Sequence, residues 1–165
     1  MKHTEIDIDL LYKTALSEAT TCLSDVSVAR GRCPKLKGLN GWIYEQTIRS
    51  CIEDELLDEI EGIGIEEQVK LHGRTRIDLV VGSLAIEIKS GGFFGKSDAE
   101  KYCKYRKILE SLGKRYLYIT AYETHEPYRK FAIDTFGDQY TFFLDSEGSW
   151  GEFIKTIRQE LKLIE

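Results

Sequence analysis

Residues 75–89, TRIDLVVGSLAIEIK, decide the fold. Two mostly aliphatic runs are separated only by Gly82 and Ser83, which is typical of a tight β-hairpin. A two-residue turn fixes the pairing register of the two strands. Counting back from this turn, we expect Asp78 to lie directly opposite Glu87.

The rest of the chain alternates between helix and strand signals. Three strands in close succession predict an antiparallel meander, and the later alternation of helix and strand predicts parallel pairs. The fold class is therefore expected to be α/β, with a mixed central sheet of about five strands flanked by helices. The expected strands are 65–71, 75–81, 84–89, 116–122 and 139–144, and the expected helices are 1–23, 41–61, 97–112, 125–136 and 149–163.

The size and composition of the chain favour one globular domain. The sequence has 165 residues, 42% of them hydrophobic, and no apolar run long enough to cross a membrane. A net charge of −5 argues against a protein that binds nucleic acid through an overall positive charge, although local basic patches are present. The four cysteines are far apart and form no CxxC pair, which disfavours a zinc ribbon or a disulfide scaffold. We expect a cytoplasmic or otherwise intracellular protein, encoded by a cell, a phage or a virus.

Charged groups on the hairpin point to metal chemistry. Aliphatic side chains are expected to fill one face, leaving Asp78, Glu87 and Lys89 on the other. Two carboxylates directly opposed in a ladder repel each other, so a divalent cation between them would explain the pair. Without metal, one of the two carboxyl groups should have a raised pKa. Glu45 falls on the apolar stripe of its expected helix, where it either contacts a cation or reaches water at the edge of the stripe.

These residues, Glu45, Asp78 and the run Glu87-Ile88-Lys89, resemble the signature of PD-(D/E)XK nucleases, the restriction-endonuclease-like enzymes. One departure is Ile77, which stands where the motif name has proline. The resemblance implies a Mg²⁺ ion, with Mn²⁺ as a substitute, held by Asp78, Glu87 and the backbone carbonyl of Ile88. It also implies that Glu45 contacts the metal through water or binds a second ion.

The same resemblance assigns the remaining roles. Lys89 would lie near the water that attacks the phosphodiester, and cleavage would leave a 3′ hydroxyl and a 5′ phosphate. The resemblance also divides this single domain into an N-terminal extension (1–40), a catalytic core (41–123) and a C-terminal helix-strand-helix (124–165).

Several residues near the expected site have alternative interpretations. A two-residue turn at His72-Gly73 places Glu67 beside Asp78, whereas a three-residue turn places Gln68 there. Basic side chains are expected to contact phosphates, although those on the strands equally suit edge-strand protection. These are Arg74, Arg76, Lys96, Lys101 and Lys104.

The glycine-rich loop 90–96 follows Lys89 directly, and its glycines permit close approach of the backbone to a ligand. Either Phe93 or Phe94 could wedge against a base or serve as a hydrophobic anchor of the loop.

The leading hypothesis is a metal-dependent DNA endonuclease of the restriction-like, phage-defence or repair type. It would act on duplex or branched DNA, as a homodimer because cutting both strands usually needs two sites. A Holliday-junction resolvase would use the same residues. The alternative of another class is a nucleic-acid-binding or assembly module that keeps the nuclease fold without turnover.

Overall fold

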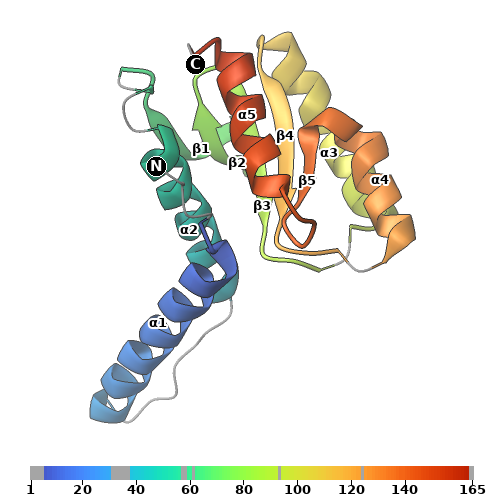
Figure 1. The fold of residues 1–165 in the computed structure, drawn as a ribbon. Coiled ribbons are helices and arrows are strands. Elements are labelled where there is room, and N and C mark those ends of the chain that lie inside the picture. Colours follow the sequence, from blue (N-terminus) through green and yellow to red (C-terminus); the bar gives the residue numbers. More distant parts are fainter. Residues whose placement is uncertain are drawn as a thin grey trace.

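A computed structural model describes residues 6–30, 38–56, 59–60, 62–92, 94–123 and 125–163, with the backbone alone for 23–30 (Figure 1). The helices are α1 (Ile8–Arg30), α2 (Leu39–Leu56), α3 (Lys96–Ser111), α4 (Glu126–Phe136) and α5 (Ser149–Leu161), with a short 3₁₀ turn at Asp138–Tyr140. The strands are β1 (Ile65–His72), β2 (Thr75–Val81), β3 (Leu84–Lys89), β4 (Arg115–Thr120) and β5 (Thr141–Phe143).

The five strands form one sheet in the order β1-β2-β3-β4-β5. β1, β2 and β3 pair antiparallel, while β3, β4 and β5 pair parallel, with helices as the crossovers. The predicted α/β class with a mixed five-stranded sheet is confirmed.

Helices cover both faces of the sheet (Figure 1). On one face, α2 and α5 bury a core with aliphatic residues of β2 and β3, such as Leu79 and Ile86. On the other face, α3 and α4 bury a second, aromatic-rich core that includes Tyr102, Tyr116 and Phe136. The strands are therefore covered on both sides, which explains why β3 reads as an almost unbroken apolar run.

The first helix is longer than predicted. The apolar periodicity ends near residue 23, but the helix continues to Arg30 because no glycine or proline interrupts the chain before Gly31. Figure 1 shows α1 lying against α2 at its start and then extending away from the sheet. The segment 31–37, between α1 and α2, lies outside the described residues. None of the described helices is both long and apolar enough to cross a membrane.

Two further details concern the helices. Asp98 caps α3 by accepting a hydrogen bond from the backbone N–H of Gly95. On α2, Trp42 is 56% exposed although it continues the apolar stripe, because the buried face is rotated toward Tyr44, Ile48 and Ile52.

Candidate metal and phosphodiester site

The hairpin has the predicted register near its turn but not at its far end. Leu79 pairs with Ile86, and the two pairs nearer the turn are also as predicted. The ladder stops there, so the predicted direct pairing of Asp78 with Glu87 is wrong. Instead, the Asp78 carboxylate accepts a hydrogen bond of 2.9 Å from the backbone N–H of Ile88. A side-chain acceptor has thus replaced a backbone acceptor, and β2 parts from β3 at this position.

The regular alternation of β2 side chains between the two faces of the sheet is interrupted at the same place. Leu79 faces the core formed by α2 and α5, whereas Ile77 belongs to the opposite core, contrary to the prediction that both share a face. Asp78 therefore lies at the fork between the two strands. A strand residue directs its N–H and C=O toward the same neighbouring strand. The Ile88 carbonyl consequently faces the same gap as the Asp78 carboxylate.

Glu87 is buried in the second core, with 4% of its surface exposed. Its Oε1 accepts a hydrogen bond of 2.7 Å from the Tyr102 hydroxyl and also forms an ion pair with Lys89 Nζ at 2.7 Å. Its Oε2 accepts a bond of 2.9 Å from the Tyr116 hydroxyl. An ionised carboxylate offers about four acceptor positions. Three are in use, so one position on Oε2 remains for a further ligand.

Lys89 is held as an ammonium group by these contacts. Burial alone would lower its pKa, but the adjacent Glu87 carboxylate, its hydrogen bond and the charge of Asp78 outweigh burial and raise the pKa above the ordinary value. The side chain remains protonated near neutral pH. It can therefore stabilise developing negative charge or orient a water molecule.

Glu45 and Gln68 complete the cluster from α2 and β1. The Gln68 amide donates to Glu45 Oε2 at 2.9 Å and, at a longer 3.4 Å, to Asp78 Oδ1. Gln68 is the residue beside Asp78, so the open choice between Glu67 and Gln68 is settled. The cause is a bulge between Lys70 and His72 rather than a three-residue turn.

The backbone of Gln68 has a φ of 49°, in the left-handed region that non-glycine residues rarely adopt. Its carbonyl accepts a hydrogen bond of 3.1 Å from Arg76. Such backbone strain is concentrated at functional sites. The kink turns the Gln68 side chain toward the two carboxylates, while Glu67 instead pairs with Arg49 at 2.6 Å.

The electrostatic field at the fork is negative. Burial raises the pKa of Asp78 to about 7, and the charges of Glu87 and Glu45 add to this effect against the Ile88 N–H and Lys89. Burial also raises the pKa of Glu45, partly offset by its Gln68 hydrogen bond. These shifts agree with the expectation that one hairpin carboxyl has a raised pKa. A divalent cation at the fork would relieve the repulsion.

The described residues contain no group of three or more His, Cys, Asp or Glu side chains already arranged to hold a metal ion. The donors available at the fork are Asp78, the Ile88 carbonyl, the remaining position on Glu87 and, at longer range, Glu45. These are oxygen donors, which suit Mg²⁺, an ion that keeps several waters and needs only one or two carboxylates. The residues therefore fit Mg²⁺ chemically.

The predicted phosphate-binding residues divide into two sets. Arg76 contacts the Gln68 carbonyl, and the Lys101 ammonium lies 4.4 Å from the ring of Tyr102, whose hydroxyl binds Glu87. These two side chains border the site. Within the described part of the chain, no polar contact joins the exposed Arg74, Lys96 or Lys104 to the cluster.

The loop after Lys89 is fixed by residues that the sequence analysis did not single out. Glu123 is buried, and its carboxylate accepts hydrogen bonds from the backbone N–H groups of Phe94 and His125, both at 3.1 Å. Phe94 packs into the second core as an anchor, so a role as a wedge is wrong for it. Phe93 lies outside the described residues.

The role of Tyr116 in holding Glu87 was also not predicted from the sequence. The parallel pairing of β3 with β4 could have indicated it, because this pairing places Tyr116 opposite Ala85, two residues before Glu87.

Gly91 offers a test of how the loop supports the site. Its φ is 118°, and a Cβ atom there would overlap the ring of Tyr122. Gly91→Ala is therefore expected to displace the loop that follows Lys89, lowering stability by about 1 to 3 kcal/mol. Chemical denaturation measures this loss. Gly92→Ala is the matched control, because it has a similar φ of 124° but no atom within 4 Å of the added Cβ. Equal losses in the two variants would show that the Tyr122 contact has no effect.

The structure thus brings together Glu45, Gln68, Asp78, Glu87 and Lys89 from four elements. Comparisons of the chain with models of protein families, with curated proteins and with solved structures found no match. The chemistry of these side chains, rather than a relative, has to indicate what the site does.

Proposed function

We propose that the protein is a metal-dependent nuclease that hydrolyses phosphodiester bonds of DNA, with Mg²⁺ as its metal. The carrying observation is the fork between β2 and β3. There, the half-buried Asp78 carboxylate with a pKa of about 7, an unpaired edge of backbone and a protonated lysine lie within one set of contacts.

Each residue has a role in this proposal. Asp78, the Ile88 carbonyl and Glu87 would hold the metal, which would polarise the phosphate and activate water. Lys89 would orient the attacking water and offset charge on the phosphorus. Glu45 would contact the metal through water or hold a second ion. Gln68 positions both Glu45 and Asp78 through its amide.

The decisive experiment is cleavage of supercoiled plasmid by the full chain. We expect nicked or linear DNA with Mg²⁺ or Mn²⁺ and none with EDTA. Asp134→Asn, which changes an exposed acid on α4, is the matched control for Asp78→Asn and should cleave normally. Comparison of linear duplex, four-way junctions and single-stranded RNA then separates a restriction-like enzyme from a junction resolvase or a ribonuclease.

One observation favours a non-catalytic binding module as the second candidate. Glu87 is already bound by two tyrosines and Lys89, as a structural carboxylate would be. If the wild type leaves plasmid, junction and RNA intact with every metal but still retards DNA in a gel, this second function replaces the first.

Metal should also stabilise the fold. At pH 8 the Asp78 carboxylate is mostly ionised, so binding of Mg²⁺ relieves its repulsion with Glu87 and Glu45. We expect the melting temperature to rise with Mg²⁺ in a saturable way. At pH 5.5 protons compete for Asp78, and the rise should be much smaller. Differential scanning calorimetry measures both. An unchanged melting temperature at saturating Mg²⁺ and pH 8 would contradict a shared metal site.

A further inference from the structure

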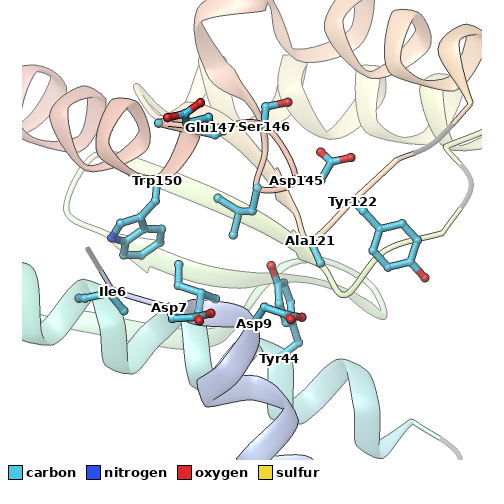
Figure 2. Close-up of a pocket in the computed structure, with 14 residues that line it drawn as sticks. Ile6, Asp7, Asp9, Tyr44, Ala121, Tyr122, Asp145, Ser146, Glu147 and Trp150 are labelled. Carbon is cyan, nitrogen blue, oxygen red and sulfur yellow. The ribbon is translucent and has the colours of Figure 1, made fainter. Parts of the chain in front are cut away.

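A separate cavity of about 700 Å³ lies on the face of the sheet covered by α2 and α5. Figure 2 shows its two walls: the N-terminal segment around Asp7 and Asp9 with Tyr44 of α2 on one side, and Ala121, Tyr122 and the 145–150 region on the other. This volume is in the range of small-molecule sites. The candidate nuclease residues Asp78, Glu87 and Lys89 are not among its lining residues.

Two polar groups in these walls have no hydrogen-bond partner within the described part of the chain. The Tyr44 hydroxyl and the Trp150 indole N–H are both buried, with residue exposures of 1% and 8%. Figure 2 shows the hydroxyl of Tyr44 directed from α2 into the space between the walls, with Trp150 on the opposite wall above Ile6. An unpaired buried polar group costs about 1 to 3 kcal/mol. A ligand that supplies an acceptor would recover this cost.

The cavity is acidic. Its described lining includes four carboxylates, Asp7, Asp9, Asp145 and Glu147, and no lysine, arginine or histidine among the residues that the structure describes. Asp9 and Asp145 are paired with cations outside the lining, Lys13 and Arg129. Asp7 caps α1 through the Leu10 N–H. Glu147 has no partner among the described residues. An anionic ligand would meet repulsion here, whereas a cation would be attracted.

Aromatic rings lie on the same wall of the cavity as Asp9, where Figure 2 shows Tyr44 beside it. The rings of Tyr12 and Tyr44 meet edge to face, with centroids 5.2 Å apart. The negative charge of Asp9 raises the pKa of both tyrosines, after the larger effect of burial, so its carboxylate lies close to them. Tyr122 lines the same wall. Tyrosine rings next to a carboxylate form a favourable environment for an organic cation.

We propose that this cavity binds a small organic cation, a protonated amine on an aromatic or aliphatic body. The ammonium group would lie between Asp9, Glu147 and the tyrosine rings. The body would fill the apolar floor formed by Ile6, Leu144 and Trp150. A polar atom on the ligand would accept from the Tyr44 hydroxyl or the Trp150 N–H.

The test uses the two tryptophans of the chain, Trp42 and Trp150, as reporters. An ¹⁵N spectrum of the full-length protein has one indole N–H signal for each, assigned with Trp42→Phe. Three probes of one shape are titrated: tyramine as its ammonium form, 4-(2-hydroxyethyl)phenol as the neutral form and 4-hydroxyphenylacetate as the anion. We expect tyramine to shift the Trp150 signal at a concentration about tenfold or more below the neutral probe, with no effect of the anion.

Variants separate binding from folding. Tyr44→Phe removes an unpartnered hydroxyl, so it should leave the melting temperature unchanged or raise it, yet weaken tyramine binding about fivefold. Glu147→Gln should weaken it as well. Tyr140→Phe is the control, because that hydroxyl donates to Glu160 elsewhere, and it should bind tyramine normally.

The proposal is overturned if the neutral probe binds as tightly as tyramine or the anion binds more tightly. It is also overturned if only the Trp42 signal moves, or if no probe shifts Trp150 up to its solubility limit. Normal tyramine binding by Tyr44→Phe and Glu147→Gln together would place the ligand elsewhere.

Discussion

The Asp78→Asn variant should lose metal-dependent cleavage while its metal-free form becomes more stable at pH 8. The asparagine keeps an oxygen that can accept the Ile88 N–H but removes the charge that repels Glu87 and Glu45. A neutral amide is a poor ligand for Mg²⁺ compared with a carboxylate. The metal site is therefore lost while the fork between the strands is retained.

The sign of the stability change follows from the pKa of Asp78. Its carboxyl ionises near 3.8 in an ordinary environment but near 7 in the fold. Between these values the folded state binds more protons than the unfolded state, so its stability falls as pH rises and is lowest, for this group, above pH 7. Removing the group should raise the melting temperature by about 3 to 8 °C at pH 8. At pH 4, where the carboxyl is protonated in the fold, the difference should nearly vanish.

Thermal unfolding of wild type and Asp78→Asn at the two pH values, each with EDTA, measures this difference. Asp134→Asn serves again as the matched control and should show no pH-dependent gain. A variant less stable than wild type at pH 8 would contradict the proposed repulsion. A variant that still cleaves with Mg²⁺ would remove Asp78 from the metal site.

Lys89→Met should reduce the rate of cleavage about 10²- to 10³-fold, the size of effect seen when one preorganised group that stabilises transition-state charge is removed. Methionine keeps much of the apolar stem but not the ammonium, which pairs with Glu87 and lies 5.6 Å from the centre of the Tyr102 ring. Because Glu87 is buried, loss of its partner should also destabilise the fold. The rate must therefore be measured well below the melting temperature of the variant.

Two comparisons isolate the catalytic part of this effect. Lys155→Met removes an exposed lysine of α5 and should leave cleavage unchanged. Lys89→Arg retains a positive charge, so it should recover stability more completely than rate. If Lys89→Met cleaves within threefold of wild type while folded, the lysine has a structural role only.

The sequence predicts the strands of the hairpin best, because their boundaries are set locally. β2 and β3 begin and end as predicted, since Gly82 and Ser83 leave room only for a two-residue turn, whereas β4 and β5 end earlier than predicted. The residue beside Asp78 was not predictable, because it depends on a bulge between Lys70 and His72 that has no clear sequence signal. Without this bulge, the register set by His72 and Thr75 would place Val69 beside Asp78, whereas the bulge places Gln68 there.

The candidate site was predicted in composition but not in arrangement. The turn correctly indicated that Asp78 and Glu87 share the end of a hairpin. It could not show that Asp78 binds the Ile88 N–H, because competition between a side chain and a backbone acceptor is decided by tertiary packing. Nor could it reveal that Tyr102 and Tyr116, from α3 and β4, hold Glu87, since both contacts depend on how the aromatic core closes.

The two outer strands of the sheet limit how copies of the chain can associate. β5 has three residues, and β1 is kinked at Gln68, bulged near Lys70 and studded with exposed charged side chains. Edge strands that are short, distorted or charged pair poorly with a strand of another chain. A dimer is consequently expected to form through helices such as α1, and the protein should resist growth into continuous cross-strand aggregates.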